Sequence, residues 1–196
     1  MSTHTKKNRT TKNTITIEKY KKTILGVTNN IYIIYFNTNY NCKKNITIKK
    51  TMSKIKKGII QNIKLLDYLT QKKVKTVKIN KNDKKIMEKI TKIINPNEKY
   101  TYCLNKDTLI LAETKTNINK SFIKDITSKH IMLCNETACA SGELVIDDNT
   151  FIFDNSSGSF IPSIQNIQIL KKALPFLKLK IIDMNSKIHD KYFSKY

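Results

Sequence analysis

Short extended runs recur along most of this chain, and they constrain its fold more than any other feature. The runs either alternate apolar with polar residues or are rich in β-branched and aromatic residues. Both patterns are typical of strands, because successive side chains of a strand point to opposite faces of a sheet. The runs lie at residues 14–18, 31–36, 45–49, 74–79, 100–104, 108–112, 130–134, 143–146, 150–153 and 177–182. They predict a sheet of many short strands.

A second pattern, with apolar residues three or four positions apart, predicts helices between these runs. Asn82 or Asp83 is a candidate N-cap, and Asp147-Asp148-Asn149 is typical of a tight hairpin turn. The helical segments lie at residues 52–69, 83–94, 119–128 and 164–174. The order of elements predicts an α+β fold with a mixed or antiparallel sheet and several helices, ending in a β-hairpin–helix–strand unit.

Basic charge is unevenly distributed along the chain. There are 37 Lys and Arg residues against 15 Asp and Glu residues, for a net charge of +22. Residues 1–100 hold 25 basic and 5 acidic residues, whereas residues 101–196 hold 12 and 10. An AT-rich genome would explain why lysine is used rather than arginine, but a uniform codon bias would not concentrate the basic residues in one half of the chain. We divide the chain into a flexible basic arm (1–13), a basic α/β segment (14–100) and a near-neutral, β-rich α+β segment (101–196); the alternative is a single domain over 14–196.

This charge predicts binding to DNA or RNA with little sequence preference. Lysine contacts phosphates as a point charge, whereas bidentate recognition of guanine is typical of arginine, and Arg9 is the only arginine. Tyr20, Tyr32, Tyr35 and Tyr40 could stack on bases where exposed, although core packing is the stronger expectation for Tyr32 and Tyr35. The candidate phosphate contacts are Lys6, Lys7, Arg9, Lys12, Lys21, Lys22, Lys43, Lys44, Lys49, Lys50, Lys54, Lys56 and Lys57.

Several function classes are disfavoured by the sequence. No apolar run reaches the roughly 18 residues of a membrane span, and the first residues lack the apolar core of a signal peptide. We therefore expect neither a membrane partner nor secretion. Cys42, Cys103, Cys134 and Cys139 are not at zinc-site spacings with one another or with the histidines. They predict reduced, partly buried thiols, with no metal and no cofactor.

Gly142 and Gly158 are two of only four glycines, so each predicts a backbone need, either a positive φ or a close approach. A hairpin between them would gather a polar cluster at its open end. The cluster would comprise Ser141, Glu143, Asn155, Ser156 and Ser157, with His130 within reach. A histidine beside a glutamate can act in acid–base catalysis, and a hydroxyl between them can be a nucleophile. The alternative, which we favour, is that these side chains bond to backbone groups and hold turns together.

Residues 128–176 resemble a short module in uncharacterised bacterial effector and toxin C-termini and in giant-virus proteins. That module has a histidine, then A-G-E, a hairpin and N-x-S-G-H-Y-x-P. The matching residues are His130, Gly142, Glu143, Asn155, Ser157, Gly158 and Pro162. Ser159 and Phe160 stand where the module has His-Tyr. The Lys-, Asn- and Ile-rich composition is similar to that of mimivirus-type large DNA viruses, which implies a location in the host cytoplasm, a virus factory or the virion.

These observations together predict a basic, non-enzymatic protein that associates with nucleic acid, as a virion or genome-associated component. One alternative is an enzyme, or an enzyme-derived effector directed at the host, that uses the cluster around His130 and Glu143. Another is a structural virion or assembly protein whose lysines bind an acidic protein partner.

Overall fold

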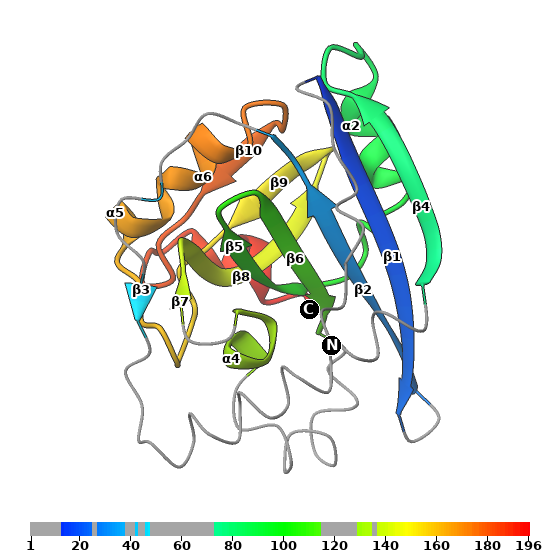
Figure 1. Ribbon diagram of the computed structural model, residues 1–196. Helices are drawn as coiled ribbons and strands as arrows, with labels where there is room; N and C mark the ends of the chain where they lie inside the picture. Colours follow the sequence, from blue (N-terminus) through cyan, green and yellow to red (C-terminus); the bar gives the residue numbers. More distant parts are fainter. Residues whose placement is uncertain are drawn as a thin grey trace, which may run out of the picture.

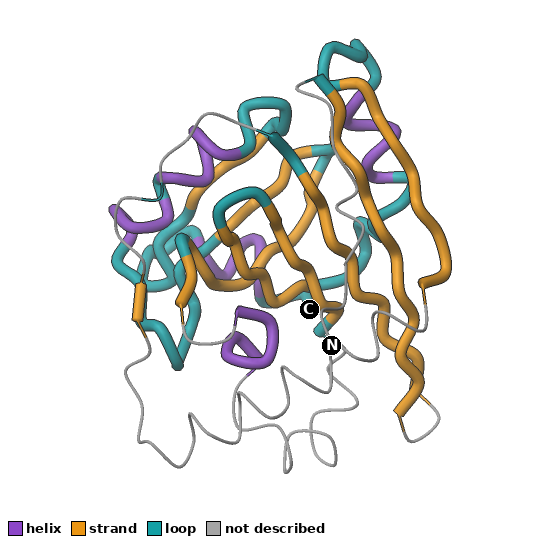
Figure 2. The backbone as a smooth tube through the Cα atoms, viewed as in Figure 1, coloured by secondary structure: helices purple, strands orange, loops and turns teal. Residues whose placement is uncertain are grey.

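The fold is known here from a computed structural model, which describes residues 13–24, 27–37, 42, 46–47, 73–114, 129–134 and 137–196 (Figure 2). Eight strands form one sheet in the order β10-β9-β8-β5-β6-β2-β1-β4, and β3 pairs separately with β7 (Figure 1). The strands are β1 (Thr14–Ile24), β2 (Val27–Tyr35), β3 (Ile46–Thr47), β4 (Lys73–Asn80), β5 (Tyr100–Asn105), β6 (Thr108–Glu113), β7 (Thr137–Ala138), β8 (Ala140–Asp147), β9 (Thr150–Phe153) and β10 (Leu179–Ile181). Every ladder is antiparallel except that between β9 and β10. The expected α+β class is confirmed.

Local hairpins and long-range pairings alternate across this sheet. The pairs β1–β2, β5–β6 and β8–β9 are neighbours in sequence, whereas β2–β6, β5–β8 and β1–β4 are distant. Strands from both sides of residue 100 therefore lie in one sheet. The predicted hairpin–helix–strand unit is present, because β8 and β9 are followed by two short helices and then by β10, but it is not the last element: a further helix follows β10.

Both faces of the sheet are covered. On one face lies the larger hydrophobic cluster, in which the rings of Tyr102 and Phe153 meet edge to face with centroids 5.0 Å apart. On the other face, Leu133 and Phe160 belong to a second cluster, and Phe193 belongs to a third. The larger cluster includes side chains of α2 (Ile86–Thr91), α5 (Ile164–Ile167) and α6 (Ile169–Ala173), whereas α4 (Lys129–Cys134) and α7 (His189–Phe193) contribute to the opposite face. Within the described part of the chain, no helix is long and apolar enough to cross a bilayer.

The predicted hairpin turn is observed, but the N-cap predicted at Asn82 or Asp83 is not. Asp148 and Asn149 have φ values of 44° and 53°, and Asp147 pairs with Thr150, so the turn between β8 and β9 has two residues with positive φ. Asp83 accepts a hydrogen bond from the Lys85 N–H (2.9 Å), but the N-cap of α2 is Lys85 itself.

Other sequence predictions were wrong or are not covered. The run 130–134 was expected to be a strand, but it lies in helix α4, because a short apolar run does not by itself distinguish a strand from one helical turn. Of the strand expected at 45–49, residues 46 and 47 form β3, and the others lie outside the described residues. The helices expected at 52–69 and 119–128, and residues 1–12 of the arm, lie outside the described residues.

The prediction of reduced cysteines was also wrong. Cys42 is bonded to Cys139, and Cys103 is bonded to Cys134. The two pairs are separated by 97 and 31 residues respectively, so sequence spacing carries no sign of either bond. The first disulfide lies against the larger hydrophobic cluster and the second lies in the cluster on the opposite face.

Candidate functional site

The polar cluster forms where the chain leaves β9 and still lies beside β8. A Cβ atom on Gly142 would overlap the carbonyl oxygen of Asp154 and lie 2.9 Å from its Oδ1 atom. Gly142 is therefore required because the Asp154 backbone approaches it closely, as the rarity of glycine in this chain predicted. Gly158 has no such need: its φ is outside the left-handed region, and nothing lies within 4 Å of an added Cβ. The expectation for Gly158 was wrong.

Asp154 is the centre of the cluster, although the sequence did not single it out. Its carboxylate is completely buried; Oδ1 accepts hydrogen bonds from the backbone N–H groups of Glu143 (2.6 Å) and Ser156 (3.0 Å). Oδ2 lies 2.8 Å from His189 Nε2, and the Tyr102 hydroxyl donates to the Asp154 carbonyl (2.8 Å). Burial raises the pKa of the Asp154 carboxyl, and these hydrogen bonds only partly oppose that effect. No local sequence pattern indicates that Asp154 contacts a histidine 35 residues away.

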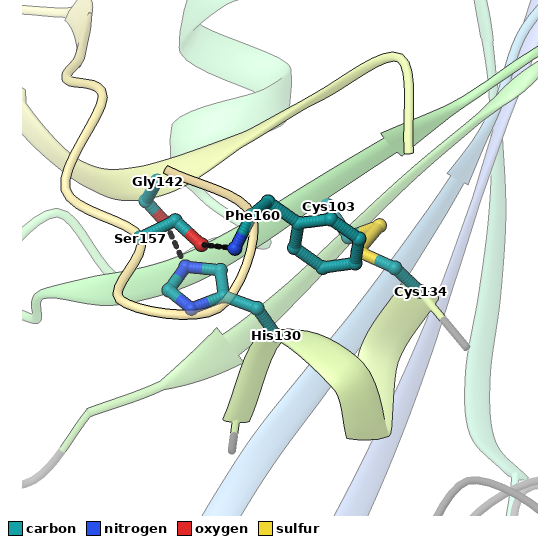
Figure 3. Close-up of a disulfide and its surroundings, with 6 residues drawn as sticks. All are labelled: Cys103, His130, Cys134, Gly142, Ser157 and Phe160. Atoms are coloured by element: carbon teal, nitrogen blue, oxygen red, sulfur yellow. Dashed lines mark hydrogen bonds between the residues drawn. A yellow bond between two sulfur atoms is a disulfide. The ribbon is translucent and has the colours of Figure 1, made fainter. Parts of the chain in front are cut away.

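Asn155 and Ser157 hold the loop that follows β9. The Asn155 side chain donates to the Pro162 carbonyl (3.2 Å) and accepts from the Met184 N–H (2.8 Å). Ser157 Oγ accepts from the Phe160 N–H (3.4 Å), and the Phe160 ring lies toward the second disulfide (Figure 3). The Asn155 and Ser157 side chains therefore bond to backbone groups, as expected if the polar cluster holds turns together.

His130 reaches the same region from α4. Its Nε2 atom lies 3.1 Å from the Gly142 carbonyl oxygen, and the residue is buried (Figure 3). Because a carbonyl oxygen only accepts, Nε2 carries a proton and cannot act as a base in this arrangement. One turn later, Cys134 is bonded to Cys103 of β5, so the disulfide attaches α4 to the sheet.

Ser141 and Glu143 point from β8 to the face that α4 covers, since they alternate with Gly142. The Glu143 carboxylate pairs with Lys99 (Oε2 to Nζ, 3.0 Å) rather than with His130. Ser141 Oγ is fully buried and has no hydrogen-bond partner among the described residues. The structure thus brings the expected residues together without the His–Glu contact that acid–base chemistry needs, and a catalytic role stays a prediction.

A separate basic surface lies at the opposite end of the sheet, and we call it the basic edge. It is formed by the lysines of residues 73–92, which contain only two acidic residues, Asp83 and Glu88. Strand β4 is the last strand of the sheet, and α2 follows it (Figure 1). The basic edge comprises Lys73, Lys75, Lys78, Lys81, Lys84, Lys85, Lys89 and Lys92, all exposed except Lys81, which is half-buried.

Among the described residues, ion pairs involve Lys73 and Lys89 of the basic edge. Lys89 pairs with Asp83, and Lys73 pairs with the buried Glu18, which also accepts from the hydroxyls of Tyr20 (2.5 Å) and Tyr35 (3.2 Å). Burial alone would raise the pKa of Glu18, but the bonds from Lys73 and the tyrosines outweigh it and lower the pKa.

The nucleic-acid contacts expected from the sequence are mostly not covered. Of those basic residues, Lys21 is exposed on β1, whereas the side chain of Lys22 and all the others lie outside the described part. Tyr20 and Tyr32 are buried, so they cannot stack on bases, and Tyr40 is not described. Sequence reasoning missed the basic edge, because exposed lysines on a strand or helix have the ordinary pattern of a solvated surface.

Among the described residues, no three His, Cys, Asp or Glu side chains gather in a group that could hold a metal ion. Comparison of the chain with protein-family models, with curated proteins and with solved structures finds no match.

Proposed function

We propose that the protein binds nucleic acid without sequence preference, with the basic edge as its phosphate-binding surface. One observation carries the proposal: an exposed edge strand and the helix after it concentrate lysines at one end of the sheet. The contrast with residues 137–196 supports it, since seven lysines there are matched by six acidic residues. The large viral genome suggested by the compositional resemblance would be one such ligand.

The chemistry of the basic edge suits a polyanion rather than a particular base sequence. Lys75, Lys78, Lys84, Lys85 and Lys92 form no ion pair within the described part of the chain, so their charges are available to phosphates. Each phosphate neutralised releases a condensed counterion, which makes affinity fall steeply with salt. Lysine contacts carry no sequence information, because phosphates are the same at every step.

The test compares two triple variants of equal charge. Lys78→Gln/Lys84→Gln/Lys85→Gln removes part of the basic edge, whereas Lys171→Gln/Lys172→Gln/Lys178→Gln removes exposed lysines near β10, at the other end of the sheet. Duplex affinity is measured by fluorescence anisotropy from low to high salt.

We expect the first variant to reduce the log–log salt slope by roughly 0.9 for each phosphate that is no longer neutralised, and the second to leave the slope unchanged. Equal reductions in both variants would show that net charge, not the basic edge, determines binding. A flat salt response of the unaltered protein would contradict nucleic-acid binding altogether.

A further inference from the structure

Strand β4 has an open backbone edge. The sheet order places β4 last, and its ladder is with β1 alone. The register pairs Ile17 with Val77, and just beyond the ladder the Lys81 N–H donates to the Asn13 carbonyl (2.8 Å). In an antiparallel ladder, hydrogen-bonded pairs alternate with non-bonded pairs. The bonded residues of β4 are therefore the odd-numbered ones, counted back from Lys81.

The even-numbered residues turn their backbone groups away from β1. Thr76 and Lys78 each direct an N–H and a C=O outward, and Asn80 directs its N–H outward. The Asn80 carbonyl is occupied, because it accepts from the Asp83 N–H in the next turn (3.1 Å). Within the described part of the chain, no hydrogen bond reaches the outward groups of Thr76 or Lys78. These groups form a short, regular template beyond the register shift near Tyr20.

The lysines of β4 determine which strand could join this template. Lys75 and Lys78 are exposed and lie on opposite faces of the strand. A second copy of β4 would place lysines near lysines, and like charges on adjacent strands repel. An extended segment rich in Glu or Asp would instead meet opposite charge on both faces of the sheet.

We propose that β4 binds an extended acidic protein segment by strand addition along Lys75–Asn80. Main-chain hydrogen bonds to Thr76 and Lys78 would supply affinity, and the lysine side chains would select for acidic residues. This goes beyond the binding of nucleic acid, and it has a consequence for it. Because both ligands use the same lysines, they bind to the basic edge in competition.

The experiment uses a labelled peptide as long as β4 with the repeat Glu-Glu-Val-Val, which places carboxylates on both faces of the added strand. The control peptide has the same sequence and charge, but every backbone nitrogen is methylated, so it cannot form a ladder. We expect the unmethylated peptide to bind at least about tenfold more tightly, since methylation removes the donors of several hydrogen bonds. Equal affinities would show attraction by charge alone and would overturn strand addition. Absence of binding would show that the lysines only protect the edge, and would overturn it too.

A pair of protein variants provides a second measurement. Thr76→Pro removes an outward N–H while the ladder with β1 stays intact, and Thr76→Ala keeps that N–H. We expect Thr76→Pro to weaken peptide binding by about tenfold relative to Thr76→Ala, with duplex DNA affinity unchanged. Equal peptide affinities of the two variants would overturn the proposal. If Thr76→Pro does not fold, the two peptides still decide the question on the unaltered protein.

Discussion

Replacement of Gly142 by alanine should destabilise the protein strongly. The new Cβ would overlap the Asp154 carbonyl oxygen, and a backbone atom cannot swing aside as the end of a flexible side chain can. Asp154 would have to move away from β8. The whole polar cluster depends on its position, so the effect should spread beyond one contact.

The magnitude follows from the bonds that this movement breaks. Displacing Asp154 breaks the bond from the Glu143 N–H to its carboxylate, worth about 1.5–3 kcal/mol because the acceptor is charged. The bond from the Tyr102 hydroxyl to the Asp154 carbonyl is worth about 1 kcal/mol. Alanine recovers roughly 0.4–1 kcal/mol by restricting the unfolded chain. We expect Gly142→Ala to lower the free energy of unfolding by about 2–3 kcal/mol.

Urea denaturation measures this change, and Gly158→Ala is the matched control. With a slope of about 2 kcal/mol/M, the midpoint of Gly142→Ala should fall by roughly 1–1.5 M. Gly158→Ala should stay close to the unaltered protein or rise slightly, since its Cβ meets nothing. A Gly142→Ala midpoint equal to that of the control would refute the argument from close approach.

Three further outcomes can be checked on the same protein. Removing the disulfide of Cys103 and Cys134 by a double alanine substitution should cost about 3–4 kcal/mol in urea denaturation, because it closes a loop of 31 residues; no change would show that the bond does not form. Glu143→Gln should lower stability by about 0.5–1 kcal/mol, the value of a partly exposed ion pair, and loss of a biological activity with the fold intact would instead make Glu143 catalytic. Because the pKa of Glu18 is lower in the folded than in the unfolded protein, its contribution to stability is present above the unfolded pKa and is lost as the pH falls through the folded pKa. Glu18→Gln should therefore make stability fall less steeply at acid pH, and an unchanged acid limb of the stability–pH curve would contradict this.

Much of the sheet could be predicted from local sequence. Runs such as 31–36 and 100–104 became β2 and β5, because β-branched and aromatic side chains fit a pleated, packed surface wherever it lies. The turn at Asp148 and Asn149 was equally local, since both residue types tolerate a positive φ. Gly142 was identified only because glycine is rare in this chain, and the same argument gave a wrong expectation for Gly158.

The contacts that define the candidate site depend on tertiary structure. Asp154 meets His189 because α7 folds back onto β8 and β9, and no pattern within either segment specifies that approach. The Glu143 carboxylate was expected to bind backbone groups or His130, but it pairs with Lys99, which the register of β5 on β8 brings beside it.

The tendency to form a strand and the place of that strand in the sheet depend on different parts of the chain. Strand propensity comes from a residue and its near neighbours, so the sequence by itself determined that extended elements and a lysine-rich segment exist. The place of a strand in the sheet depends on burial against partners far away in the chain, and a one-residue shift would exchange its faces. Only the tertiary structure therefore decided that β4 is the last strand, that its outward backbone groups lie beside lysines, and that two pairs of distant cysteines meet.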